Sequence, residues 1–144
     1  MTRTIFVLNG PNLNLLGTRE PDVYGSATLD DIAAMMTDHA ASLGIALDIR
    51  QSNHEGHLID WLHEAQAVGA AAVILNAGGY SHTSVALHDA IRAIATPVIA
   101  VHLSDPATRE PFRHADLVAL AASQSIKGLG ARGYLTALDA AVRL

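Results

Sequence analysis

Cysteine is absent from the 144-residue sequence. Its absence excludes disulfide bonds, metal sites built on thiolates and a cysteine nucleophile, and it makes the chain indifferent to the redox state of its compartment. Lysine is nearly absent as well, because Lys127 is the only one and the other eight basic residues are arginines. A mechanism through a lysine imine would therefore have to depend on Lys127 alone.

Clustered positive charge is missing too. Nine Lys and Arg stand against 14 Asp and Glu, and no basic patch could follow a phosphate backbone, so nucleic-acid binding is not expected. The first apolar patch, residues 5–8, is too short for a signal-peptide core or a membrane span. We expect a cytoplasmic protein whose partner is a small molecule or another protein, not a membrane.

Half of the residues are apolar, so a chain of this length can bury one sizeable core. We expect a single domain over residues 1–144. Apolar runs that predict strands alternate with segments whose apolar residues recur every three or four positions, as in amphipathic helices. The predicted strands cover residues 4–9, 45–51, 70–77, 96–104 and, less clearly, 116–122; the predicted helices centre on residues 29–36, 58–65 and 85–94, with a closing helix over about 130–142.

This alternation predicts the α/β class. Several of the strands are continuously apolar, which is typical of central parallel strands covered on both faces. Five β–α units favour a flavodoxin-like three-layer sandwich with a five-stranded parallel sheet of order 2-1-3-4-5. In that order strands 1, 3 and 4 meet at the switch point, where ligands bind beyond the carboxyl ends of the strands. The turns at residues 9–12, 76–82 and 102–104 should therefore converge on one pocket.

Local signals predict where the helices begin and end. An S-x-x-E capping box begins at Ser52, before the second helix, and Thr28 or Ser26 could cap the first. Gly44 and Gly69 stand where the first and second helices should stop.

Several familiar signatures lack the spacing or the surrounding sequence that their function requires. GLGARG at residues 128–133 fits a dinucleotide-binding pattern, but no βαβ unit with an acidic residue about 20 positions on follows it. HEGH at residues 54–57 is one residue short of the zinc-protease pattern. A phospho-receiver domain would need an aspartate where Asn76 ends the third strand, and a flavodoxin would need a Ser/Thr-rich phosphate loop after the first strand.

Residues 9–25, NGPNLNLLGTREPDVYG, show neither helical nor strand periodicity. Structureless connections longer than about 12–15 residues are uncommon in compact domains and tend to be lids or binding loops. Gly17 and Gly25 bracket the charged part and could act as hinges. We expect residues 17–25 to be mobile without ligand.

Five strings, in order over almost the whole chain, resemble the type II 3-dehydroquinate dehydratases. They are LNGPNLNLLGTREPDVYG, QSNHEGHLIDWLHEA, LNAGGYSHTSVALHDAI, VHLSDPATREPFR and GLGARGY. The resemblance implies an anti elimination of water from 3-dehydroquinate to 3-dehydroshikimate through an enolate, in the shikimate pathway and without metal or cofactor. It also implies a homo-oligomer, a dodecamer built from trimers.

The resemblance assigns four catalytic residues. Tyr24 is the base, acting as a phenolate, and Arg19 supplies the positive charge that favours the phenolate. Asn12 supports the enolate oxygen with an ordered water, and His102 is the general acid for the departing hydroxyl. From spacing alone, Arg19 and Tyr24 could also be an ordinary cation–aromatic pair.

Six further residues match substrate-binding positions of the family. Asn76 and the backbone amides around Leu103 and Ser104 would hold the carboxylate of the substrate, and His82, Asp89 and Arg113 would hold its ring hydroxyls. In the family, an acidic residue like Asp89 reaches the site of a neighbouring subunit.

The sequence departs from the family at three positions. Ala100 replaces a usual glutamate on the same side of the strand as His102, which predicts a less well oriented acid and a gain in turnover for Ala100→Glu. Asp105 replaces asparagine and would weaken carboxylate binding unless it points away, and Ser125 replaces glycine in what we expect to be a turn. These departures leave open an alternative, a non-catalytic or weakly active relative that binds small acids or serves in assembly.

Overall fold

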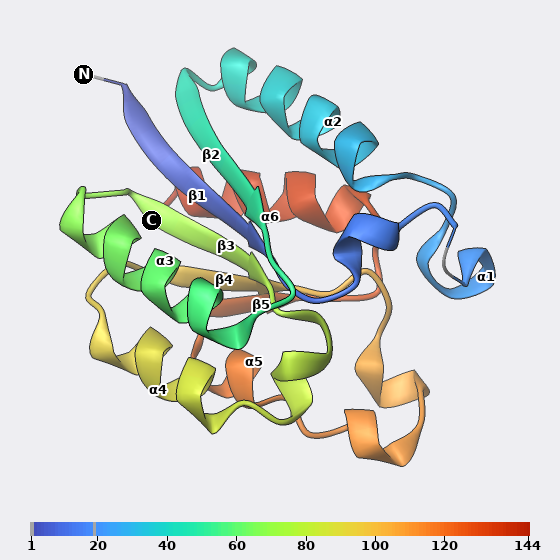
Figure 1. Cartoon of the computed structure of the whole chain (residues 1–144). Coiled ribbons are helices and arrows are strands. Elements are labelled where there is room, and N and C mark those ends of the chain that lie inside the picture. Colours follow the sequence, from blue (N-terminus) through green and yellow to red (C-terminus); the bar gives the residue numbers. More distant parts are fainter. Residues whose placement is uncertain (1, 19) are drawn as a thin grey trace.

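The computed structural model describes residues 2–18 and 20–144, and a five-stranded parallel sheet runs through its centre (Figure 1). The strands lie in the order β2-β1-β3-β4-β5, which confirms the predicted flavodoxin-like topology. Their bounds are β1 Arg3–Asn9, β2 Ile45–Gln51, β3 Ala72–Asn76, β4 Val98–Val101 and β5 Gln124–Ile126.

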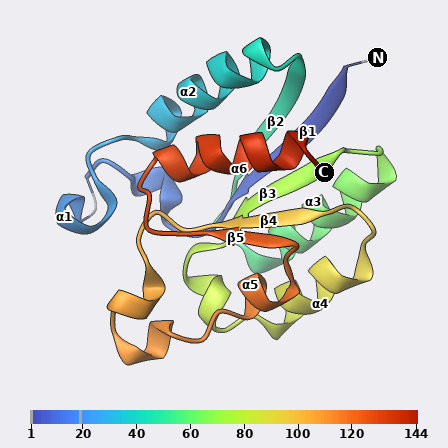
Figure 2. The same ribbon diagram turned by 180° about the vertical axis from the view of Figure 1, so that it is seen from behind.

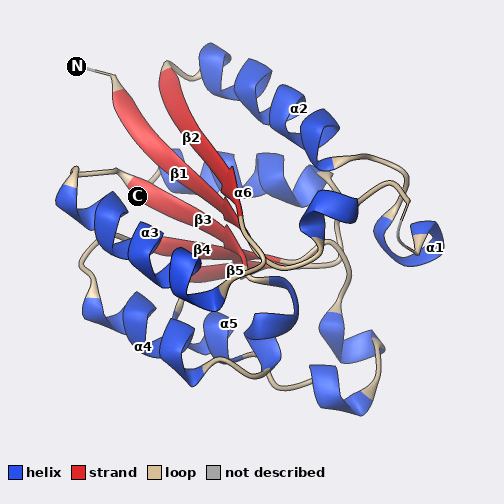
Figure 3. Cartoon of the chain, viewed as in Figure 1, coloured by secondary structure: helices blue, strands red, loops and turns tan. Residues whose placement is uncertain are grey.

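Helices cover both faces of the sheet (Figure 3). On one face lie α2 Leu29–Ser42 and α6 Arg132–Val142; on the other lie α3 Glu55–Ala67, α4 Val85–Ala93 and α5 Leu117–Ala121 (Figure 2). Short helices occupy the connections: η1 Leu13–Leu15, α1 Pro21–Tyr24, η2 Gly78–His82, η3 Pro106–Thr108 and η4 Pro111–Arg113. None of the described helices is long and apolar enough to cross a membrane.

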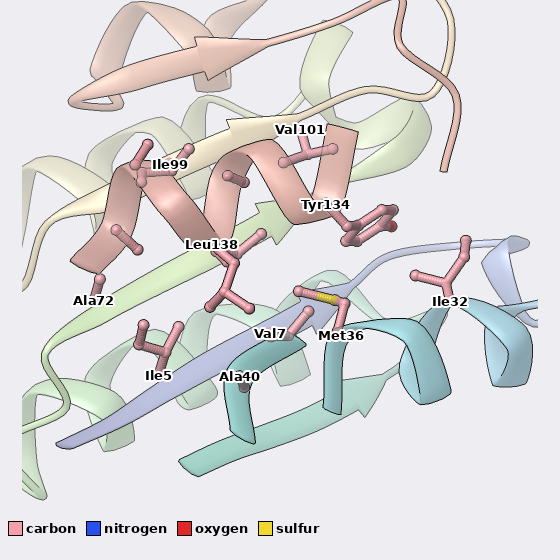
Figure 4. Packing of buried hydrophobic residues seen from close by; sticks show 14 of the residues in the cluster. Ile5, Val7, Ile32, Met36, Ala40, Ala72, Ile99, Val101, Tyr134 and Leu138 are labelled. Atoms are coloured by element: carbon pink, nitrogen blue, oxygen red, sulfur yellow. The ribbon is translucent and has the colours of Figure 1, made fainter. Parts of the chain in front are cut away.

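Alternation along the strands divides the core into two layers. In β1, Ile5 and Val7 pack under α2 and α6, whereas Phe6 and Leu8 pack on the α3–α4 side. Figure 4 shows the first layer, where Met36 of α2 and Leu138 of α6 meet β1. Burial of each such side chain contributes roughly 1.5–3 kcal/mol. These layers hold the strand ends, and hence the turns that follow them, in fixed positions.

The predicted strand over residues 116–122 is wrong. Residues Leu117–Ala121 form α5, capped by the Asp116 carboxylate, which accepts a hydrogen bond from Ala119 N–H at 2.9 Å. A short apolar run does not distinguish a strand from a buried helix, and here the cap decides for the helix. The fifth strand is β5, so Ser125 pairs with Ala100 in the sheet and does not lie in a turn.

The cap predictions had mixed outcomes. Thr28 forms a capping box with Asp31 at the start of α2, and Gly44 and Gly69 follow the ends of α2 and α3 with φ of 70° and 73°. The box predicted at Ser52 is wrong, because α3 begins at Glu55 with His54 as its N-cap and Ser52 lies outside the helix. Ser52 Oγ instead accepts from His54 N–H at 3.0 Å.

Candidate active site

The turns after β1, β3 and β4 converge on one pocket at the carboxyl ends of the strands, on the side of the molecule where α1 lies (Figure 1). This location is the switch point predicted from the strand order. The pocket is lined by Pro11, Asn12, Leu13, Tyr24, Asn76, Gly78, Gly79, His82, His102, Leu103, Ser104, Pro106, Arg109 and Arg113.

Eight of the ten predicted site residues line this pocket: Asn12, Tyr24, Asn76, His82, His102, Leu103, Ser104 and Arg113. Arg19 lies outside the described residues. Asp89 is exposed on α4 and is not part of the pocket lining within one chain. Arg109 lines the pocket, and Asp116 contacts a lining residue, although neither was predicted from the sequence.

Two glycines let the first two turns lie against each other. A Cβ on Gly10 would be only 2.6 Å from the carbonyl oxygen of Ala77, and Gly78, with φ of +58°, lies against the Pro11 carbonyl. Asn12 adopts the left-handed conformation at φ 69°, which asparagine tolerates better than most residues. The close approach brings Asn12 and Asn76 into the same pocket.

Asn76 is held by a buried hydrogen-bond network. Its Nδ2 donates to the Tyr134 hydroxyl at 2.9 Å, its Oδ1 accepts from Gly78 N–H at 3.2 Å, and the Tyr134 hydroxyl donates to Asn9 Oδ1 at 2.7 Å. Burial raises the pKa of the Tyr134 phenol, so it stays neutral and remains a donor. The network fixes which edge of the Asn76 amide faces the pocket, and sequence reasoning missed both Asn9 and Tyr134.

Tyr24 lies beside a guanidinium that was not assigned a role from the sequence. Arg109 Nη1 donates to the Tyr24 hydroxyl at 2.9 Å, and the guanidinium carbon lies 5.3 Å from the centre of the ring. The hydrogen bond to Tyr24 is the largest of the causes that raise the pKa of Arg109. A guanidinium in this place stabilises negative charge on the phenolic oxygen. Arg109 belongs to the quoted string VHLSDPATREPFR, but nothing in its spacing marks it.

His102 is the partner of a carboxylate. Its Nε2 lies 2.8 Å from Asp116 Oδ2, and its ring stacks on His82 with 6.0 Å between centroids and 16° between planes. Burial raises the pKa of Asp116, but the hydrogen bonds from His102 and the Ala119 N–H outweigh it and leave the pKa below its usual value. Ala100 brings no charge to His102, and the carboxylate comes from α5 instead.

Asp105 does not line the pocket. Its Oδ1 accepts from Ala107 N–H at 3.0 Å and caps η3, and Lys127 Nζ lies 4.0 Å from the same oxygen. Asp105 therefore points away from the predicted carboxylate site, the condition under which it was expected to be harmless. Lys127 lies outside the pocket lining as well, so it is not placed for an imine with a ligand bound there.

Fold and site together define a class of protein. It is a flavodoxin-like α/β fold whose switch-point pocket contains a phenol–guanidinium pair and an imidazole bonded to a carboxylate, groups suited to proton transfer. Within residues 2–18 and 20–144, no three His, Asp or Glu side chains are grouped as a metal ion would require.

The model of the family Dehydroquinase class II matches residues 3–142, and the chain belongs to this family. It is 59% identical over 142 residues to the 3-dehydroquinate dehydratase of Maricaulis maris, covering 99% of this chain and 97% of the relative. Rhizobium johnstonii has a 3-dehydroquinate dehydratase that is 56% identical over 142 residues, with coverage of 97% and 96%. The family and these relatives make the chain an enzyme of the lyase class.

Solved structures agree. The type II dehydroquinase of Butyrivibrio crossotus superposes with a TM-score of 0.96 at 37% identity, covering 98% of both chains. The type II dehydroquinase of Propionibacterium acnes superposes with a TM-score of 0.93 at 40% identity, covering 99% of this chain and 98% of the other.

Proposed function

We propose that this protein converts 3-dehydroquinate to 3-dehydroshikimate by anti elimination of water in the shikimate pathway. The proposal depends on one observation: two side chains that can transfer protons, Tyr24 and His102, line the same pocket. Tyr24 accepts a hydrogen bond from Arg109, and His102 is hydrogen-bonded to Asp116. The names of the relatives supply the substrate.

The first step removes the proton α to the ketone. Tyr24, as a phenolate, is the base, and the hydrogen bond from Arg109 stabilises its charge. By its match to the family, Arg19 supplies a second positive charge that favours the phenolate. The electron pair left on carbon spreads onto the ketone oxygen as an enolate, which Asn12 supports through an ordered water.

The second step expels the hydroxyl. The enolate electron pair forms the new C=C bond as the C–O bond breaks, and the departing oxygen takes a proton from His102 and leaves as water. Asn76 and the backbone amides around Leu103 and Ser104 hold the substrate carboxylate. His82 and Arg113 hold the ring hydroxyls.

Assembly would complete the site. Asp89 is exposed on α4 and absent from the pocket of its own chain, which fits a contact with the substrate of a neighbouring subunit. Large apolar side chains are exposed on α4, η4 and α5, with Val85 at 61%, Phe112 at 69% and Leu120 at 73%. Exposed apolar side chains mark an interaction surface where they form one contiguous patch. We propose that a second copy of the chain covers them, in trimers grouped into a dodecamer.

The experiment is an absorbance assay for the conjugated enone after addition of 3-dehydroquinate. We expect turnover by the parent protein and a loss of about 10²–10⁴-fold in Tyr24→Phe, the size of a general-base contribution. Tyr80→Phe is the matched control: Tyr80 does not line the pocket and donates its hydroxyl to the Asn53 carbonyl at 2.7 Å, so turnover should fall far less than in Tyr24→Phe. If the parent protein produced no enone absorbance, the proposal would be refuted. If Tyr24→Phe kept the activity of the parent protein, the assignment of Tyr24 as the base would be refuted.

A further inference from the structure

Both carboxylate oxygens of Asp116 are hydrogen-bonded. Oδ1 accepts from Ala119 N–H at 2.9 Å and caps α5, while Oδ2 lies 2.8 Å from His102 Nε2. The side chains are largely shielded from water, with 17% of Asp116 and 9% of His102 exposed. The helix cap therefore fixes the orientation of the oxygen that meets the imidazole.

The position of the proton on the His102 ring follows from this contact. The hydrogen bonds that Asp116 accepts from His102 and the Ala119 N–H keep its pKa below the usual value despite burial, so at neutral pH it is an ionised carboxylate that can only accept. The ring nitrogen that meets it, Nε2, must therefore carry a hydrogen. In the neutral ring the second nitrogen, Nδ1, is then unprotonated, and in the charged ring Nδ1 carries the extra proton.

Nδ1 is the nitrogen left for chemistry. It makes no hydrogen bond to the described residues, and it is not a buried unpaired atom, since Ser81 Oγ is the only such side-chain atom among them. His102 lines the pocket, and Nδ1 is the ring nitrogen that Asp116 leaves unbonded. The ring plane is held from a second side by His82, whose Nδ1 is bonded at 2.7 Å to the carbonyl of Ala115, the residue before Asp116.

Ala100 leaves His102 without a carboxylate from its own strand. It lies on the same side of the strand as His102, is 1% exposed in an apolar cluster with Val98 and Val118, and supplies no acceptor for the imidazole. The carboxylate that reaches His102 comes from α5, through a cap that also starts that helix.

We propose that Asp116 is the positioning residue of the acid step. It keeps one hydrogen of the His102 ring on Nε2, so that the second proton of the charged ring lies on Nδ1 and is the one delivered to the departing hydroxyl. This inference rests on the proposed function. When the C–O bond breaks, its electron pair goes to oxygen, the Nδ1 proton joins it, and water leaves. His102 ends neutral, with Nε2–H still donating to Asp116.

Two substitutions at Asp116 separate positioning from structure. Asp116→Asn keeps the helix cap through its one oxygen, because Asn caps as well as Asp, and so turns its NH₂ toward Nε2. An NH₂ there favours the opposite tautomer and opposes the charged ring. Asp116→Ser also keeps a cap but leaves the ring without an enforced tautomer. We expect kcat to fall about 10²-fold or more in Asp116→Asn and about tenfold in Asp116→Ser, with KM changed less than about threefold.

Asp139→Asn is the matched control. Asp139 Oδ1 lies 2.6 Å from His39 Nε2 between α6 and α2, away from the pocket, so this variant breaks a histidine–carboxylate pair without touching the site. We expect its kcat to equal that of the parent protein. Nitrogen NMR of ¹⁵N-histidine-labelled protein, with His102→Gln to assign the signal, should give the Nε2–H tautomer in the parent and Nδ1–H in Asp116→Asn.

The outcomes separate the two proposals. A parent protein inactive on 3-dehydroquinate would remove the function, while the NMR tautomer would still decide whether Asp116 sets the ring. An active parent with equal kcat in Asp116→Asn and Asp139→Asn would overturn the positioning role and leave the function intact. Asp116→Ser losing more than Asp116→Asn, or an Nδ1–H tautomer in the parent, would overturn it as well.

Discussion

The negative charge beside His102 depends on positions 100 and 116. Ala100 contributes none, and Asp116 contributes one carboxylate. Because Asp116 already holds the imidazole, a glutamate at position 100 would add a second carboxylate on the same face of the sheet. It would also be buried in an apolar cluster, between Leu75 and Ser125 of the neighbouring strands. The gain in turnover expected from the family pattern therefore no longer follows.

We predict that Ala100→Glu lowers the free energy of unfolding by about 2–4 kcal/mol and does not raise kcat, because the new carboxylate is buried in an apolar cluster and Nε2 of His102 is already bonded to Asp116. Urea denaturation and the enone assay measure the two effects. Ala34→Glu, the same change at an exposed position on α2, should alter stability by less than about 0.5 kcal/mol. A rise in kcat would show that Asp116 does not replace the missing glutamate.

At the scale of elements, how well a strand could be located from the sequence depended on the burial of its faces. The inner strands β1 and β3 are buried on both faces and read as apolar runs, so their positions followed from the sequence. The edge strand β5 has only three residues, two of them exposed, and left no pattern. Residues directly after strands were found because strand ends converge, whereas Arg109 and Asp116 were missed because they meet their partners across 85 and 14 residues. The mobility expected for residues 17–25 stays a prediction.

The turns after β1 and β3 give the prediction at this scale. Gly10→Ala would place a Cβ 2.6 Å from the Ala77 carbonyl, so one turn must move and carry Asn12 or Asn76 with it. We expect kcat to fall and stability to drop by about 1–3 kcal/mol. In Gly56→Ala, within α3, the new Cβ meets nothing within 4 Å, and stability should rise by about 0.5–1 kcal/mol with kcat unchanged. Equal effects of the two changes in the enone assay and in urea would contradict this account.

For the whole molecule, carboxylates bound to donors determine the response to acid. Hydrogen bonds lower the pKa of Asp31, through Thr28, of Asp48, through Arg50, and of Glu110, through Arg113; Asp116 is lowered as described above. Their folded pKa values lie below the unfolded ones, so at neutral pH both states are ionised and the stabilisation is complete. As the pH falls through about 4, the unfolded state binds protons first, and stability is lost.

Asp48 tests this whole-molecule response because two hydrogen bonds of 2.9 Å from Arg50 hold it on the edge strand β2, outside the pocket lining. We predict that the contribution of these carboxylates to the free energy of unfolding is constant from pH 7 to about 5.5 and declines below about pH 4.5. Asp48→Asn should lose less than about 1 kcal/mol at neutral pH, since the pair is partly exposed, and should decline less steeply in acid. Asp38→Asn, at an exposed carboxylate on α2 that has no hydrogen bond to the described residues, is the matched control for the loss of one negative charge. If urea titrations at each pH gave Asp48→Asn the slope of the parent protein, the Arg50 contact would not be part of the acid response, because only a group with different pKa values in the two states can change that slope.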